Sequence, residues 1–290
     1  YGAHRDLHSF PTRRSSDLLA STLASLLPPL TEEQALEAAT LCSVSGKKMH
    51  LTRFYQPPIR SPHHTATPVS LVGGGNRARP GEVSLAHHGV LFLDELPEFS
   101  GKALEALREP LEAGVITISR ANHRISYPAR FLLVAAMNPC PCGFQGDPSG
   151  KCLCTQPRID GYQAKISGPL LDRIDLVVEV PRLSPEELTG APEPGQDSAT
   201  VRRAVEACRH WQMERAGKLN SALTGDELEQ YCKPDKKGKH LLQQAMEKLH
   251  LSARGYHRVL RLARTLADLN QQPAIREEHL LEALGYRGQW

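Results

Sequence analysis

The hydrophobic and polar positions of this chain follow two patterns. In the first part, short apolar runs between polar and glycine-rich segments predict buried strands of a parallel sheet, because such strands are apolar on both faces. After about residue 200, apolar residues recur at helical spacing. The predicted strands are 90–93, 131–136 and 176–180, and the predicted helices are 18–27, 31–41, 100–113, 159–166, 199–216, 225–231, 239–248, 253–269 and 276–284.

Local signals refine this outline. Thr31 and Gln34 form a capping-box pattern at the start of one helix. Residues 115–119 and 123–127 alternate apolar and polar positions around 120–122, which predicts a β-hairpin. The segment 44–72 is rich in Pro, His and Ser and is expected to be irregular.

The pattern predicts an α/β domain followed by a helical domain. Residues 183–200 contain several prolines and glycines and are expected to form a linker between residues 18–182 and 201–290. Residues 1–17 have no hydrophobic period, and the segment 8–18 resembles translated sequencing-adapter DNA, so we expect a foreign leader. A targeting or disordered leader is the alternative.

Composition places the chain among globular proteins. It has 290 residues, of which 40% are hydrophobic and 23% charged, enough for one large and one smaller domain. The net charge of +3 does not by itself indicate nucleic-acid binding. Apolar runs are too short to span a membrane, and an odd count of seven cysteines suits a reducing cytoplasm.

The strongest chemical signal is the pair Asp94 and Glu95 directly after the apolar run 90–93. Open α/β sheets bind ligands at the carboxyl ends of their strands. This is the form of a Walker B strand, in which Asp94 holds Mg²⁺ through its water shell and Glu95 polarises the attacking water. The alternative is a solvated strand end.

Four cysteines form two C-x-C pairs. Thiolates that converge in one loop suit tetrahedral Zn²⁺, although the spacing within each pair is tighter than the usual C-x₂-C. Reduced loop thiols are the alternative. The residues are Cys140, Cys142, Cys152 and Cys154.

Two histidine pairs and a basic hairpin tip are further candidates. In both the 63–64 and 87–88 pairs, adjacent side chains are expected to point different ways, so that each pair is a poor chelate and makes polar loop contacts. Arg120, His123 and Arg124 stand at the predicted hairpin tip, where they suit contacts to a phosphate backbone or merely a solvated tip.

The order of these signals resembles an AAA+ ATPase module, and more narrowly the magnesium-chelatase-like ComM/YifB family. The resemblance covers about residues 18–287 and includes Pro-His-His at 62–64 and Leu-Leu-Asp-Arg-Ile-Asp at 170–175. The other matching motifs are 71–75, 79–82, 84–87, 89–98, 106–112, 119–121, 135–139 and 251–258.

The resemblance implies a fold and further site residues. The fold is the three-layer α/β sandwich of P-loop NTPases with a parallel sheet, a hairpin insertion and a carboxyl-terminal helical lid. Asn138 resembles sensor 1, with an Asx turn before Pro139 as the alternative. Arg173 resembles the arginine finger that acts on a neighbouring subunit, or else pairs with Asp172 or Asp175. Arg254 resembles the sensor 2 arginine and is preferred to Arg258; a solvated helix face is the alternative for both.

The chain departs from the family at one important point. It contains no G-x-x-x-x-G-K-[S/T] motif, whose backbone amides and lysine cradle the phosphates. The helix 18–27 looks like the one that normally begins in that loop. We therefore expect a chain truncated at its amino end, without the P-loop, the central P-loop strand and a Lon-like amino-terminal domain, that binds ATP poorly or not at all.

The function implied by the resemblance is that of an ATP- and Mg²⁺-dependent ring hexamer. Such a protein is expected to translocate DNA and promote branch migration during recombination of incoming DNA. An ATPase subunit for inserting Mg²⁺ into a porphyrin is the main alternative, and an ATP-driven, protease-associated unfoldase is a third.

Overall fold

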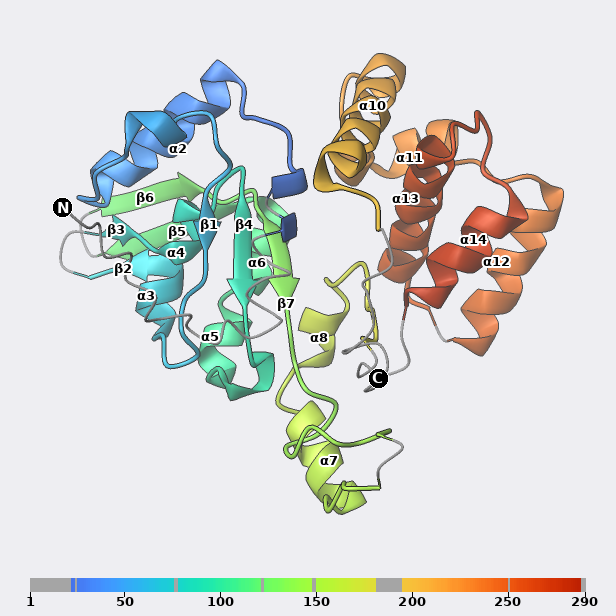
Figure 1. Ribbon diagram of the computed structural model, residues 1–290, viewed down its shortest axis with the longest axis horizontal. Helices are drawn as coiled ribbons and strands as arrows, with labels where there is room; N and C mark the ends of the chain where they lie inside the picture. Colours follow the sequence, from blue (N-terminus) through green and yellow to red (C-terminus); the bar gives the residue numbers. More distant parts are fainter. Residues whose placement is uncertain are drawn as a thin grey trace, which may run out of the picture. The chain divides into compact units, whose positions relative to one another are not determined.

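A computed structural model describes residues 22–23, 25–75, 78–120, 123–147, 150–180, 195–249 and 251–287. The chain forms two compact units, residues 1–141 and 142–290. The first is a mixed α/β unit and the second is mainly helical (Figure 1). The predicted leader, half of the helix 18–27 and most of the linker 183–200 lie outside the described residues, so the predicted domain limits stay predictions.

A three-stranded parallel sheet lies at the centre of the first unit. Its strands run side by side in the order β1 (Ile59–Arg60), β4 (Val90–Leu93) and β7 (Leu132–Ala135) (Figure 1). All four residues of β4 are buried, as predicted for this strand. Gly89 allows β1 to approach, because a Cβ atom there would lie 1.9 Å from the carbonyl oxygen of Pro58.

Two of the three predicted strands differ from expectation. β7 forms, but it is not buried, and Leu132 is 45% exposed. The segment 176–180 forms no strand, and Val180 is 79% exposed. A strand needs a hydrogen-bonding neighbour, and within the described residues β7 pairs only with β4 and the segment 176–180 with no strand.

Helices precede the central strand β4 along the chain. α2 (Glu32–Val44) begins at Thr31, whose predicted capping box with Gln34 is present. The segment 44–72 is more regular than expected, because it contains η1 (Leu51–Arg53), β1 and α3 (Pro68–Val72). Thr67 and Pro68 are the signal that was missed, since a threonine N-cap followed by proline favours a helix start.

The predicted helix 100–113 is two helices. α5 (Gly101–Glu105) and α6 (Arg108–Ala113) are separate. Pro110 explains the break, because it has no N–H to donate to the carbonyl of Ala106 and its ring clashes with that carbonyl. The remaining short elements of this part are α4 (Glu82–Leu85) and η2 (Leu96–Glu98).

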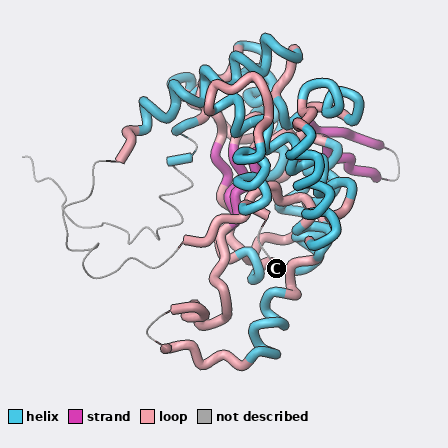
Figure 2. Tube along the Cα trace, turned by 90° about the vertical axis from the view of Figure 1, so that its right-hand side faces the viewer, coloured by secondary structure: helices cyan, strands magenta, loops and turns pink. Residues whose placement is uncertain are grey.

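Two hairpins complete the first unit. β5 (Val115–Arg120) and β6 (His123–Pro128) form the predicted hairpin, with Arg120 opposite His123. Figure 2 shows these two strands apart from the three-stranded sheet. The second hairpin joins β2 (Gly73–Gly74) to β3 (Arg79–Pro80).

The second unit is built from helices around an apolar cluster. α11 and α13 have the predicted limits, α7, α10, α12 and α14 lie within a few residues of theirs, and α8 and η3 were not predicted. The core includes Leu228, Leu242, Val259 and Leu280. The elements are α7 (Gln156–Gln163), α8 (Gly168–Leu171), α10 (Ser198–Ala216), η3 (Asn220–Ala222), α11 (Gly225–Tyr231), α12 (Lys236–Lys248), α13 (Ala253–Leu269) and α14 (Glu277–Gly285). Among the described residues, no helix is both long and apolar enough to span a membrane.

Candidate functional site

The carboxyl ends of the three parallel strands meet at one edge of the sheet. Asp94 and Glu95 follow β4, and Asn138 follows β7 shortly after its last residue. Because Leu93 and Ala135 are partners in the ladder, both segments leave the sheet at the same level. This is the edge at which open α/β sheets bind ligands.

The backbone at Glu95 is unusual. Its φ of 54° and ψ of 48° place it in the left-handed region, which a residue with a Cβ atom adopts at a cost of about 1–3 kcal/mol. The Glu95 N–H donates to Oδ1 of Asp94 at 2.9 Å, and the Leu96 N–H donates to the carbonyl of Ala136 at 3.0 Å. These bonds hold the turn and tie the Asp-Glu pair to the segment that leads to Asn138.

His64 contacts the Glu95 carboxylate. Its Nδ1 lies 3.2 Å from Oε2 of Glu95, and both side chains are about one-third exposed. The sequence placed His64 in a loop and did not connect it with this acid. His64 comes shortly after β1, the strand next to β4, and because β1 was not predicted the sequence offered no signal for this contact.

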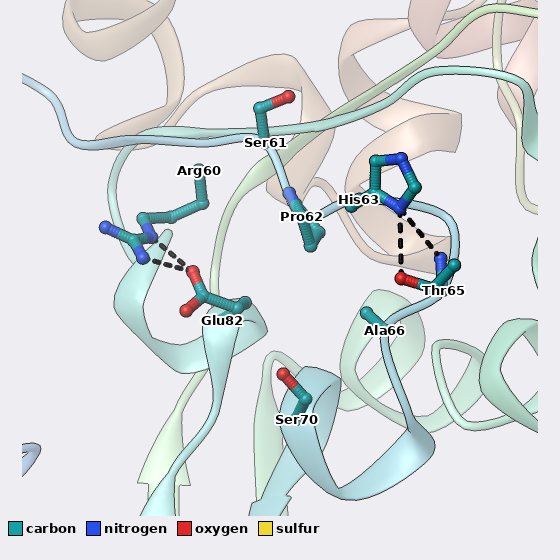
Figure 3. A pocket seen from close by; sticks show the side chains of 8 residues that line it. All are labelled: Arg60, Ser61, Pro62, His63, Thr65, Ala66, Ser70 and Glu82. Carbon is teal, nitrogen blue, oxygen red and sulfur yellow. Dashed lines mark hydrogen bonds and ion pairs between the residues drawn. The ribbon is translucent and has the colours of Figure 1, made fainter.

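A cavity of about 310 Å³ opens beside this histidine segment (Figure 3). Its lining includes Arg60, which pairs with Glu82, and His63, which is hydrogen-bonded to Thr65. Lys47 also pairs with Glu82 at 3.0 Å. Asp94, Glu95 and Asn138 do not line this cavity, and of the candidates from the sequence its lining includes His63, so it is a neighbour of the Asp-Glu edge and not the predicted site.

The predicted arginines lie in the second unit. Arg173 follows α8, is half-buried and donates to the carbonyl of Pro169 at 2.6 Å. Arg254 is exposed in the first turn of α13. Arg258 is not on a solvated face, because it pairs with Asp175 at 3.1 Å and its burial lowers the pKa of the guanidinium. Asp175, which follows α8, is therefore linked to α13 through Arg258.

The remaining predicted candidates are a loop and a hairpin tip. The four cysteine sulfurs of the loop lie within 4.8 Å of one another. At the hairpin, Arg124 is exposed. The side chains of Arg120 and His123 lie outside the described part of the chain.

The histidine pair 87–88 differs from expectation. The two rings are 3.8 Å apart and both reach Oε2 of Glu37 on α2, with Nε2 at 3.1 Å for His87 and 2.6 Å for His88. Adjacent residues were expected to point different ways. His88 has a φ of 59°, and this left-handed backbone turns its ring toward that of His87.

These three side chains have the composition of a metal site, but hydrogen bonding opposes that role. Nδ1 of His87 accepts a hydrogen bond from the Arg130 N–H at 3.0 Å, so the proton of the neutral ring is on Nε2. A protonated Nε2 donates to Glu37 and has no lone pair for a metal. The cluster therefore acts as a hydrogen-bonded clasp between α2 and the start of β4.

This clasp should make the fold sensitive to acid. Burial and the neighbouring His88 lower the pKa of His87, which is 2% exposed. Below about pH 6.5 the unfolded chain therefore binds a proton that the folded chain does not. The free energy of unfolding consequently decreases as the pH is lowered through this range. We expect His87→Gln to flatten the pH dependence of the free energy of unfolding between about pH 7 and pH 5.5, measured by urea titration with circular dichroism.

His88→Gln is the comparison variant for this prediction, because it leaves His87 buried, which is the larger cause of its lowered pKa, and should keep most of the wild-type slope. The lowered pKa of Glu37, caused by hydrogen bonds from His88 and His87, acts in a separate range. It adds stability that is lost only below about pH 4.5, so it does not obscure the result. Equal slopes for wild type and His87→Gln would contradict the assignment.

Comparison with known proteins agrees with this geometry. The family model described as magnesium chelatase, subunit ChlI, matches residues 2–188, and the model for the carboxyl-terminal part of that subunit matches residues 195–287. The competence protein ComM of Haemophilus influenzae is 48% identical over 287 residues, and the YifB protein of Escherichia coli is 45% identical over the same length. Each alignment covers 99% of this chain and 56% of the relative, so the chain spans about half the length of these proteins.

A parallel sheet with an Asp-Glu pair at its carboxyl edge and a helical second unit is consistent with an AAA+ fold of the magnesium-chelatase type. The chain belongs to the ComM/YifB branch of the magnesium-chelatase family. Similarity to the magnesium-chelatase subunit ChlI of Chlorella vulgaris is more limited, with 33% identity over 24% of this chain.

Proposed function

We propose that this chain is the ATP-hydrolysing module of a longer, DNA-translocating protein. The observation that carries the proposal is the placement of Asp94 and Glu95 at the carboxyl edge of a parallel sheet, beside the segment that bears Asn138. Glu95 accepts a proton from the attacking water, and Asn138 orients that water. His64 holds the Glu95 carboxylate from the neighbouring strand end.

Mg²⁺ fits the residues present. Carboxylate oxygens are the donors that this cation prefers, and the Asp94 carboxylate is oriented by the N–H of Glu95. When bound, Mg²⁺ supplies charge that stabilises the transferring phosphoryl group. Asp94 would hold it through water.

The sequence contains only part of the usual binding site for the phosphates of ATP. No P-loop motif is present in the 290 residues. Gly73 and Gly74 belong to the β2–β3 hairpin and not to a strand-to-helix turn, so they do not replace it. The proposed module therefore needs a P-loop from elsewhere in the polypeptide.

We assign Arg173 and Arg254 to the phosphates as well. Arg173 completes the site of a neighbouring subunit in a ring hexamer, and Arg254 reaches the nucleotide of its own subunit. A guanidinium suits both roles because it stays charged and presents several donors to phosphate oxygens. The half-buried position of Arg173 and the exposed position of Arg254 are compatible with these roles.

DNA is the substrate that we favour. The Haemophilus relative is named a competence protein, which supports work on incoming DNA in the cytoplasm. The β5–β6 hairpin carries Arg120 and Arg124 toward its tip, where they suit contacts to a phosphate backbone. Metal insertion into a porphyrin is the second candidate, supported by the family description of a magnesium chelatase.

ATP hydrolysis that rises with DNA is the expected result. The assay uses a longer form of the protein in which upstream sequence supplies a P-loop, with forked or single-stranded DNA at several salt concentrations. Arg120→Ala with Arg124→Ala should remove the DNA stimulation and leave the DNA-free rate unchanged, because two phosphate contacts are lost. Lys236→Ala with Lys237→Ala removes the same charge from an exposed helix start and is the matched control.

The 290-residue chain is a second control, since without a P-loop it should show no saturable ATP binding. Micromolar ATP affinity of this chain would contradict the role given to the P-loop. A rate of ATP hydrolysis that does not change with DNA but requires a porphyrin and a partner subunit would favour the chelatase alternative.

A further inference from the structure

The loop that follows the Asn138 segment gathers four cysteines that the ATPase proposal does not use. All four sulfur atoms lie within 4.8 Å of one another, although the pair Cys140 and Cys142 and the pair Cys152 and Cys154 are separated along the chain. Cys140 is buried, and Cys152 and Cys154 are half-buried. The question is what holds these sulfurs together.

The sulfur distances suit a metal and not a disulfide. Sγ of Cys142 and Sγ of Cys152 are 3.6 Å apart. A disulfide requires about 2.05 Å. Four thiolates at about 2.3 Å from one zinc ion lie about 3.8 Å from each other in a tetrahedron. The observed separation is therefore close to the edge of a tetrahedral Cys₄ site.

The backbone explains how the tight C-x-C spacing can work. In extended chain, residues two apart point to the same side and the residue between them points away. Leu153 is 89% exposed, whereas Cys152 and Cys154 on either side of it are half-buried. The Sγ atoms of Cys152 and Cys154 lie within 4.8 Å of each other, so both thiols of this pair point to the same side. The spacing that weakened the prediction from sequence is compatible with chelation in this conformation.

The loop buries few of its side chains. Among its described residues, 140–147 and 150–154, only Cys140 is buried. Backbone hydrogen bonds close turns at Asp147 and Gly150, and Gly143, Gly146 and Gly150 adopt positive φ. Long loops without an apolar core are costly to order, and metal coordination by several side chains is one way to meet that cost.

We propose that Cys140, Cys142, Cys152 and Cys154 bind one structural Zn²⁺. Thiolates are soft ligands that select zinc over magnesium or calcium, and each thiol releases its proton on binding. Four protein ligands leave no position for water, so the site is structural and not catalytic. Because Cys140 stands two residues after Asn138, the metal also fixes the end of the segment that leaves β7.

Metal analysis of the purified 290-residue chain tests this proposal. We expect about one equivalent of zinc by mass spectrometry. Cys152→Ser with Cys154→Ser should lose the zinc, whereas Cys42→Ser, which removes a half-buried thiol elsewhere, should retain it. Neither readout depends on ATP hydrolysis, so failure here is separate from failure of the proposed function.

A second measurement does not need the variants to fold. Exchange of zinc for Co²⁺ in the wild-type chain should give the intense visible absorption of tetrahedral, thiolate-bound cobalt, and added zinc should remove it. The proposal is wrong if wild type holds no zinc and shows no such absorption with Co²⁺. It is also wrong if the double serine variant keeps its zinc or if the chain contains iron with the absorption of an iron–sulfur cluster.

Discussion

Replacing Glu95 by Gln should reduce ATP turnover by about 100-fold or more in a form of this protein that carries a P-loop. The amide has nearly the shape of the carboxylate but cannot accept a proton from the attacking water. Because Asp94 and its bond to the backbone of residue 95 remain, ATP and Mg²⁺ binding should change little. Steady-state hydrolysis and nucleotide titration, measured on the same preparation, separate these two effects.

Glu98→Gln is the matched control for this variant. Glu98 is exposed, lies three residues further along the same turn, and should tolerate the change with its hydrolysis rate unaltered. A Glu95→Gln protein that retains more than about a tenth of the wild-type rate would show that another group acts as the base. Loss of nucleotide binding together with turnover would instead indicate that the left-handed turn has rearranged.

Periodicity predicted the helical part of the fold because burial there is local. α13 packs its apolar residues at helical spacing onto the core of its own unit, and its predicted limits were confirmed. β4 was predicted for a related reason, since all four of its residues are apolar and buried. In both cases the element's own sequence records its environment.

Other elements depend on neighbours that their own sequence does not describe. The apolar run 176–180 is as strand-like as β4, but it forms no strand because no described strand pairs with it. β1 is the opposite case, since its two residues carry no visible pattern and it forms because Gly89 lets it reach β4. Pairing across the sheet is a tertiary property, and hydrophobic periodicity does not contain it.

The candidate site divides in the same way. The position of Asp94 and Glu95 could be predicted because a run of apolar residues ends at them. The contact of His64 with Glu95 could not, since it joins two strand ends across the sheet. The left-handed backbone at Glu95 and His88 was equally invisible, because neither residue type favours that region as glycine does.

The helical unit also contains a buried ionic network that the sequence did not reveal. Asp268 and Arg264 are each 2% exposed, and Arg264 Nη2 lies 3.0 Å from Asp268 Oδ1. Arg215 donates to both carboxylate oxygens at 2.6 and 2.7 Å, and Asn220 donates to Oδ2 at 2.8 Å. Burial alone would raise the pKa of Asp268, but the bonds from Arg215 and Asn220 and the charge of Arg264 outweigh it and lower the pKa.

Asp268→Ala should therefore destabilise the helical unit by about 3–5 kcal/mol, since it leaves the buried guanidinium of Arg264 without a counter-charge. Trp211 lies on α10 of this unit, so the change in its fluorescence during urea unfolding reports on the unit. Glu214→Ala breaks an exposed ion pair with His210 on α10 and should change stability by less than about 0.5 kcal/mol.

A double variant tests the physical reason behind this prediction. If the cost comes from the uncompensated charge, Arg264→Leu with Asp268→Leu should be more stable than Asp268→Ala alone, because both buried charges are removed. If lost packing dominates instead, the double variant should be no more stable than the single one. A loss below about 1 kcal/mol in Asp268→Ala would contradict the prediction and indicate that water or a shifted Arg215 replaces the carboxylate.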